Sequence, residues 1–455
     1  MPRRTADLHL ATTSSDDDAR ASSLPRDFDA GERLMRQQGL RGLRAALAAD
    51  PVAPANGWLE FWRGYVAQYD DLGLARIHWL AAEEVFVRES DACGIELTAC
   101  GLVQCTLFDN QTYEGFEART LRVAVTAAAP GEQSPLALFR VAARLQVFGE
   151  GENGRCVDAG DIETAFAALG SRLDAEVRLR CAAAALHGMG RSFDRVSAGD
   201  FHAAGAAVAA LPEVGDYSRA LWHVCVSQAR WFEAGAMAPR LMEELDAVER
   251  CAPSAAGRRL VARALMLRAL HALAGQDATA AREHLEAGHR LLDPAHPQDY
   301  ALFHFLFSRN ALSLGDIETA SAHATLSLRK SEEAFSPASE IGPILNQTGM
   351  VDVALGRYEE AAAVFTRAVE LFSGAHAAPS RCYLHLTHAL RHLREGSHDK
   401  ARVELIAGFA LARSIEHTHF FRALPRLAAQ LCAAALDLDA DAAYARKVIA
   451  LRSLA

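Results

Sequence analysis

The stretch Pro343–Phe372, PILNQTGMVDVALGRYEEAAAVFTRAVELF, gives the strongest indication of how this chain folds. It predicts two helices that are joined by a tight turn at Leu355-Gly356-Arg357. Small residues such as Ala361 let two antiparallel helices approach closely, and large ones such as Phe365 fill the gap to the next hairpin. One hairpin of this size buries too little apolar surface to fold alone. The stretch therefore predicts related hairpins beside it.

The C-terminal half repeats this pattern at a nearly constant step. Predicted turn glycines recur every 40 or 41 residues, and an alanine follows five residues after four of them. The glycines are Gly235, Gly275, Gly315, Gly356 and Gly396, and the alanines are Ala280, Ala320, Ala361 and Ala401. The first unit departs from the pattern, because Arg240 stands at its alanine position. A register that holds over five turns predicts a repeat array.

The spacing within each unit is that of a tetratricopeptide (TPR) repeat. In Pro343–Phe372 the packing positions of that repeat fall on Gly349, Gly356, Tyr358, Ala361, Phe365 and Ala368. The step exceeds the roughly 34 residues of a TPR, so we expect longer helices or extended loops such as LLDPAHPQDY and FSGAHAAPSR. We therefore expect an all-α fold, a TPR-like superhelix of helical hairpins, or α-solenoid.

The composition indicates an acidic protein of the cytoplasm. With a net charge of -10, the chain as a whole repels nucleic acid, so we expect no direct nucleic-acid binding. The nine cysteines are odd in number and form no CxxC pair, as in proteins of a reducing compartment. The longest apolar stretch, around Ala203–Leu211, is too short to cross a bilayer, and no export segment follows Arg3-Arg4. We expect no membrane association and no cofactor.

Four regions are expected along the chain. Residues 1–24 are rich in Ser, Thr and Asp and predict a disordered leader. Residues 25–150 predict irregular helical hairpins, and residues 151–215 a helical joint region. Residues 216–455 hold the TPR-like repeats and their closing helices, which Pro425 starts or kinks.

Within the N-terminal hairpins, apolar spacing predicts helices at 28–47, 58–65, 74–89, 95–108, 113–127 and 135–148. We interpret Trp58, Phe61, Trp62 and Trp79 as a hydrophobic cluster that stabilises the first hairpins.

Two glycine-containing joints are expected beyond these helices, at residues 149–157 and at Gly188–Asp194. The first is rich in glycine, but it lacks GxxxxGK[ST] and no strand pattern precedes it. This argues against a phosphate-binding loop.

Three parts of the chain resemble the helical-repeat region of MalT-type bacterial regulators, especially those in which that region precedes a bacterial transcriptional activator domain. Near the start, Trp58–Gly64 followed by Ala75 and Leu80 resembles the opening hairpins. The middle repeats match in length and turn placement. At the end, Phe420–Leu436 and Tyr444–Ile449 resemble the closing helix that leads into the DNA-binding segment. The resemblance runs from about residue 27 to residue 455.

The resemblance implies signal transduction and transcription regulation. Regulators of this type carry an N-terminal P-loop ATPase and a C-terminal DNA-binding module, and this sequence contains neither. We therefore expect either a free-standing sensor or scaffold, or one part of a regulator whose other module lies on another chain.

Histidines concentrate in the last third of the chain. His385, His388 and His392 are spaced at i, i+3 and i+7, which places them on one helical face, and Glu404 follows on the next predicted helix. Such a set could bind zinc in a metal-dependent hydrolase, which is the alternative function. No HExxH motif or cysteine partner accompanies these histidines, and the repeat register places them at packing positions. We favour structural histidines and expect no metal site and no catalytic residue.

The inner surface of the array is the expected binding site. In a TPR-like superhelix the first helix of each unit lines a concave groove, and the residues at the groove positions are Phe305, Arg309, Asn346, Met350, Tyr383 and Arg394. Arginine offers paired donors to a carboxylate, asparagine can bond a peptide backbone, and aromatic rings anchor apolar groups. We expect a non-enzymatic scaffold or sensor that binds a protein or peptide partner, or a small effector, in this groove.

Overall fold

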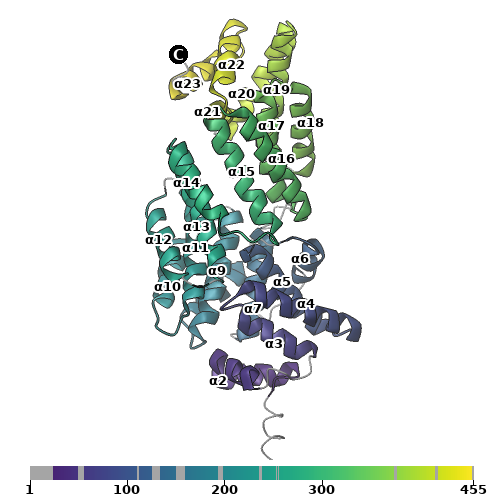
Figure 1. The fold of residues 1–455 in the computed structure, drawn as a ribbon, viewed down its shortest axis with the longest axis vertical. Coiled ribbons are helices and arrows are strands. Elements are labelled where there is room, and N and C mark those ends of the chain that lie inside the picture. The colour runs from purple at the N-terminus through teal and green to yellow at the C-terminus, as the bar shows by residue number, and fades with distance from the viewer. Residues whose placement is uncertain are drawn as a thin grey trace, which may run out of the picture.

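The computed structural model describes residues 24–49, 56–109, 112–124, 134–149, 159–192, 198–234, 238–252, 254, 256–372, 377–415 and 419–452. These residues form helices and turns, and none of them lies in a strand. The fold is an all-α superhelix of TPR-like hairpins, elongated from α2 at one end to the closing helices at the other (Figure 1).

The helices of the N-terminal part follow one another along the chain. They are α2 Phe28–Ala49, α3 Gly57–Ala67, α4 Leu72–Glu89, α5 Ala92–Asp109, α6 Phe116–Ala124, α7 Pro135–Gly149, α8 Ala159–Leu169, α9 Ala175–Ser192, α10 Ala198–Ala209, α11 Asp216–Ala234 and α12 Leu241–Cys251. The predicted helices at 58–65, 74–89, 95–108 and 135–148 are confirmed to within a few residues.

The later helices pair into four hairpins, and the chain then closes with three more helices. The hairpins are α13 Arg258–Ala274 with α14 Ala278–His289, α15 Pro297–Ser313 with α16 Ile317–Glu333, α17 Ala338–Ala354 with α18 Tyr358–Leu371, and α19 Ala378–Arg394 with α20 His398–Ser414. The closing helices are α21 His419–Ala423, α22 Pro425–Asp437 and α23 Ala442–Arg452.

Glycines set against aromatic rings hold the N-terminal hairpins together. A Cβ on Gly64 of α3 would lie 2.7 Å from the indole of Trp79, and one on Gly101 of α5 would lie 2.5 Å from the same indole. The indole Nε1 of Trp79 donates to the carbonyl oxygen of Phe61 at 3.2 Å, so the buried ring keeps its hydrogen bond. Trp62 is also fully buried. Of the predicted tryptophan cluster, Phe61, Trp62 and Trp79 are thus fully buried in the core of this part, and Trp58 packs against that core while partly exposed.

Helix α5 runs through the middle of the N-terminal part, and most of its residues are buried. Its last carbonyl groups have no partner within the helix, and arginines from distant helices satisfy them. Arg263 of α13 donates to the carbonyl oxygen of Phe108, and Arg259 donates to that of Asp109. Arg259 also bonds the Asp299 carboxylate of α15 at 2.6 Å. These contacts join the N-terminal hairpins to the repeats.

The four hairpin turns share one hydrogen-bond geometry, but the first is displaced by one residue. Gly315, Gly356 and Gly396 have φ of 79°, 72° and 71°. In the first hairpin Gln276, with φ of 64°, takes this left-handed position, whereas Gly275 does not.

In each turn, the following N–H bonds the carbonyl oxygen five residues earlier, as in a Schellman motif. The alanine five residues after the left-handed residue is fully buried, and these alanines are Ala281, Ala320, Ala361 and Ala401. The prediction that Gly275 forms this turn and that Ala280 is its packing alanine is thus wrong by one position. The left-handed residue sets the register, whichever amino acid fills it.

Two further boundaries differ from the expectation. Helix α9 continues to Ser192, so Gly188 lies in a helix and not in a joint. A Cβ on Gly188 would collide with the Leu145 carbonyl oxygen of α7, which means that this glycine allows close helix packing. Helix α17 begins at Ala338 rather than at Pro343, and it carries this proline within its first two turns. The expected joint at 149–157 lies outside the described residues from position 150 onward.

Within the described ranges, every helix is too short or too polar to span a lipid bilayer.

Candidate functional site

The first helices of the C-terminal hairpins form the inner side of the superhelix. α13 packs against α15, α15 against α17, and α17 against α19. The second helices α14, α16, α18 and α20 do not approach one another as closely. Helices that lie closer together mark the inner side of a curved array. The short helix α21 returns to this side and packs against α15, beside which it lies in Figure 1.

Three of the predicted groove residues lie on neighbouring first helices and keep part of their surface exposed. Phe305 and Arg309 lie one turn apart on α15, and Asn346 lies on α17. The Oδ1 atom of Asn346 is buried and has no hydrogen-bond partner within the described structure. Aromatic, cationic and amide groups are therefore presented by two adjacent helices.

Met350 and Tyr383 belong to the core of the C-terminal hairpins instead. Each is only 2% exposed. The ring of Tyr383 lies 5.5 Å from that of Phe365 and 5.6 Å from that of Phe420 on α21. The return of α21 thus covers Tyr383, and little of either side chain is left for a ligand to contact.

Arg394 lies at the end of α19 and contacts the preceding turn. Its guanidinium sits 4.6 Å from the centre of the Tyr358 ring and donates to the Gly356 carbonyl oxygen at 3.0 Å. It satisfies an unpaired carbonyl group at a hairpin turn. The structure therefore does not bring Arg394 together with Phe305, Arg309 and Asn346.

Among the described residues, Arg309 has no carboxylate partner, whereas several other interior arginines have one. Arg144 pairs with Asp161 at 2.6 Å, and Arg259 pairs with Asp299. No described carboxylate or carbonyl group forms an ion pair or a hydrogen bond with the Arg309 guanidinium. Burial, together with repulsion from Arg422, lowers the pKa of Arg309 to about 10.

Arg422 does not stand at a groove position of the repeat pattern. It lies on α21, far from Arg309 in the sequence, and it is partly exposed. Both Arg309 and Arg422 act electrostatically on the Tyr383 phenol, whose pKa burial raises. No repeat spacing relates α21 to α15, because α21 lies outside the hairpin array. Only the folded superhelix places these two arginines near the same tyrosine.

Two of the C-terminal histidines pair with separate carboxylates. His385 Nδ1 lies 2.6 Å from the Glu404 carboxylate, and His392 Nδ1 lies 3.1 Å from that of Glu395. His388 Nδ1 is buried without a partner in the described structure. Among the residues that the structure describes, no three His, Cys, Asp or Glu side chains are arranged to hold a metal ion.

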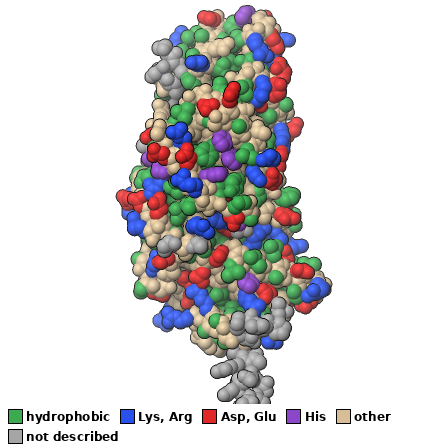
Figure 2. Space-filling model, in the orientation of Figure 1, with side chains coloured by type: hydrophobic (Ala, Val, Ile, Leu, Met, Phe, Trp, Pro, Cys, Tyr) green, Lys and Arg blue, Asp and Glu red, His purple; other side chains and the backbone are tan. Residues whose placement is uncertain are grey.

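A second histidine group lies on α14, α15 and α16, and Figure 2 shows histidine side chains gathered near the middle of one face of the molecule. The Nδ1 atoms of His304 and His323 are 3.1 Å apart, and the His289 ring centre lies 5.4 Å from that of His304. Burial lowers the pKa of all three imidazoles, that of His304 to about 4. They are therefore neutral near pH 7.

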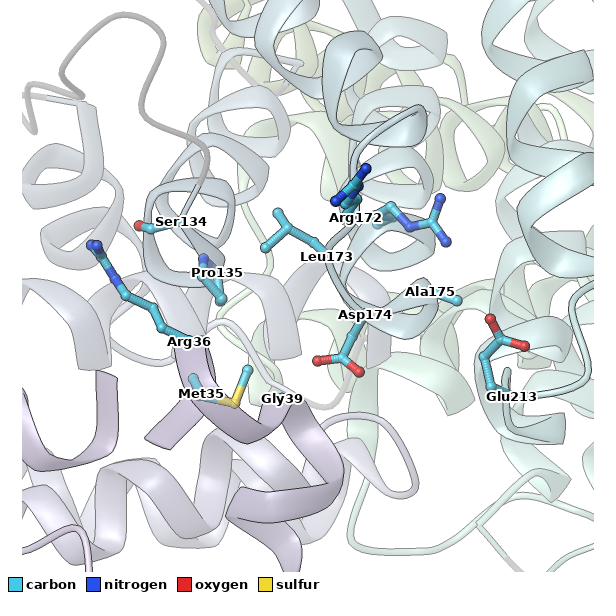
Figure 3. A pocket seen from close by; sticks show the side chains of 11 residues that line it. Met35, Arg36, Gly39, Ser134, Pro135, Arg172, Leu173, Asp174, Ala175 and Glu213 are labelled. Carbon is cyan, nitrogen blue, oxygen red and sulfur yellow. The ribbon is translucent and has the colours of Figure 1, made fainter. Parts of the chain in front are cut away.

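A cavity of about 790 Å³ lies at the α2 end of the molecule, between α2 and the loops before α7, α9 and α11 (Figure 3). Three arginines and two carboxylates line it, so their charges nearly balance. Asp174 accepts a hydrogen bond from the Leu40 amide at 2.8 Å, beside Gly39 with its φ of 67°. This carboxylate therefore stabilises the kink of α2, and none of the predicted groove residues reaches the cavity.

Comparisons with known proteins give matches among solved structures alone. No family model matches the chain, and no curated protein matches it. A chain of the crystal structure of the APC/C hetero-tetramer Cut9-Hcn1 is similar, with a TM-score of 0.48 and 13% sequence identity. The similarity covers 91% of this chain and 87% of that one.

Proposed function

We propose that this chain is a non-enzymatic scaffold or sensor that binds a protein segment in the inner surface formed by α15 and α17. The observation that supports this most is the set of partly exposed side chains of Phe305, Arg309 and Asn346 on adjacent first helices. A peptide fits such a surface, because an aromatic ring anchors an apolar side chain and an amide pairs with backbone groups. A small effector with the same groups would use the same residues.

The resemblance to MalT-type regulators supports a role in signalling or transcription regulation in the cytoplasm. In this proposal the bound segment or effector changes how the scaffold engages a regulatory partner, and the scaffold does not touch nucleic acid itself. The net charge of -10 supports this proposal, because an acidic scaffold repels nucleic acid.

Affinity capture with the full chain tests the proposal. The chain is incubated with cell extract, and the retained proteins and small molecules are identified by mass spectrometry. We expect Phe305→Ala combined with Asn346→Ala to lose the ligand that the unchanged chain retains. Val403→Ala removes an exposed apolar side chain from a second helix and should retain the ligand.

Circular dichroism of each variant checks that helicity is intact. Retention of the same ligand by the double variant would place the binding surface elsewhere. If the unchanged chain retained no protein and no small molecule, the scaffold proposal itself would be wrong.

A further inference from the structure

The cavity at the α2 end of the molecule is large enough to hold a small ligand. Its volume of about 790 Å³ lies within the range of roughly 300–1,000 Å³ that is usual for small-molecule sites. Met35, Pro135 and Leu173 give it an apolar part of the wall. The wall is built from α2 and from three loops that are distant in the sequence, so only the folded chain forms it (Figure 3).

Several polar groups of the wall already have partners within the fold. Arg36 pairs with Glu32 at 2.9 Å, and the hydroxyl oxygen of Ser134 caps the first turn of α7. The Oδ2 atom of Asp174 accepts the hydrogen bond from the Leu40 amide. These groups hold the walls of the cavity in place, and we assign them no part in binding.

Two arginines near the start of α9 keep unused donors. Arg172 is exposed and forms no ion pair or hydrogen bond with another described residue. Arg178 donates to the Leu169 carbonyl oxygen at 2.8 Å, but its Nε atom is buried and has no partner in the described part of the chain. The N–H groups at the start of α9 also favour an anion. This part of the wall therefore suits a carboxylate.

Two carboxylates give the cavity unused acceptors. Glu213 is exposed in the loop before α11, and within the described ranges it bonds no other group. The hydrogen bond from α2 engages only one oxygen of Asp174, which leaves Oδ1 available. Figure 3 shows both carboxylates on the opposite side of Leu173 from Arg172. An ammonium group bonds such oxygens well.

We propose that this cavity binds a small zwitterion, namely an amino acid or a short peptide with free termini. Its carboxylate lies at Arg172 and Arg178, and its ammonium group lies at Glu213 and Asp174. A ligand with both charges fits best, because a simple anion meets two carboxylates and a simple cation meets the arginines. The apolar part of the wall accepts an apolar side chain.

This site is separate from the proposed binding surface on α15 and α17, because none of the predicted groove residues lines the cavity. The inference therefore goes beyond the proposed function. It assigns a second ligand to the chain, at a place where α2 forms one wall.

Isothermal titration calorimetry with the full chain tests the site. The probes are the twenty standard amino acids and leucyl-leucine, each added alone up to millimolar concentration. We expect at least one probe to bind. Its N-acetyl and amide derivatives, which lack the ammonium or the carboxylate charge, should bind roughly tenfold more weakly or worse. Failure of every probe to bind would overturn the proposal, as would equal binding of the charged probe and both derivatives.

Two variants locate the bound probe in the cavity. Arg172→Gln and Glu213→Gln should each weaken binding roughly tenfold or more, since each loses a charge-assisted hydrogen bond. Neither side chain has a partner among the described residues, so the thermal midpoint should not change. Arg250→Gln on α12 and Glu318→Gln on α16 are the matched controls, because these exposed residues do not line the cavity. Both controls should bind the probe as the unchanged chain does.

Hydrogen exchange gives an independent readout. Amide exchange in α2 should slow when the probe binds, because a ligand in the cavity covers Met35 and the kink at Gly39. Unaltered affinity in both cavity variants, or protection that appears only outside the cavity walls, would overturn the assignment. Phe305→Ala with Asn346→Ala should bind the probe unchanged, so this site and the proposed binding surface can fail separately.

Discussion

The ring of Phe365 on α18 occupies the space that a side chain on Gly349 of α17 would need. A Cβ built on Gly349 would lie 2.6 Å from the ring carbons of Phe365. The two helices of this hairpin therefore meet where one of them has no side chain. Phe365 is fully buried, so its ring has little room to move away.

Gly349→Ala should lower the free energy of unfolding by about 1–3 kcal/mol through overpacking. Urea denaturation followed by circular dichroism measures this change. The companion variant Gly349→Ala with Phe365→Leu should recover part of the loss, because leucine frees space beside residue 349. An unchanged transition in Gly349→Ala would show that α17 and α18 do not meet at this point.

Ala361→Trp should also destabilise the hairpin, by about 1–3 kcal/mol or more. Ala361 is fully buried against the neighbouring helices, and tryptophan cannot fit there without displacing them. Ala363 lies two residues further on the exposed face, so Ala363→Trp is the matched control and should unfold as the unchanged protein does. Equal melting curves for the two variants would contradict the interhelical position of residue 361.

Gln276→Gly should stabilise the protein by about 0.5–1 kcal/mol, because glycine adopts a left-handed conformation without steric cost. Gln276 has φ of 64° and an exposed side chain, so the change removes strain and disturbs no packing. The reciprocal change Gly315→Gln should destabilise the next turn by a similar amount, since Gly315 has φ of 79°. Thermal denaturation of the two variants measures the expected rise in stability of the first and the expected fall in stability of the second. A loss of stability in Gln276→Gly would mean that the turn register is wrong.

Acidification should destabilise the fold through the group of His289, His304 and His323. Burial lowers the pKa of these imidazoles in the folded state, that of His304 to about 4, so the unfolded chain binds protons more readily. Their contribution to stability is complete above the usual histidine pKa of about 6.5 and is lost as the pH falls toward 4. Lys330 and the neighbouring imidazoles add repulsion to a charged His304.

Urea unfolding at pH 7.5 and at pH 5.0 measures this dependence. His304→Phe combined with His323→Phe should reduce the loss of stability between the two pH values. His398→Phe is a control at the exposed start of α20 and should leave the difference unchanged. An identical pH dependence in the unchanged protein and in the double variant would assign the acid sensitivity to other groups.

The sequence alone determined the fold class and most helix boundaries of the N-terminal hairpins. Apolar spacing and turn residues are local signals, since they report which side chains share a helix face and where a helix must end. They predicted the helices on both sides of Gly356 and the burial of Ala361 and Phe365. They also predicted the tryptophan core of the first hairpins.

Tertiary structure decided the register of the first turn and the exposure of the inner residues. Gln276, and not Gly275, takes the left-handed position of the first turn, and Ala281, five residues later, is the fully buried alanine. Helix α21 returns to α15 after several hairpins. For this reason α21 covers Tyr383, and Arg422 repels the positive charge of Arg309. That return depends on the summed rotation of successive hairpins, a quantity that no local residue spacing encodes.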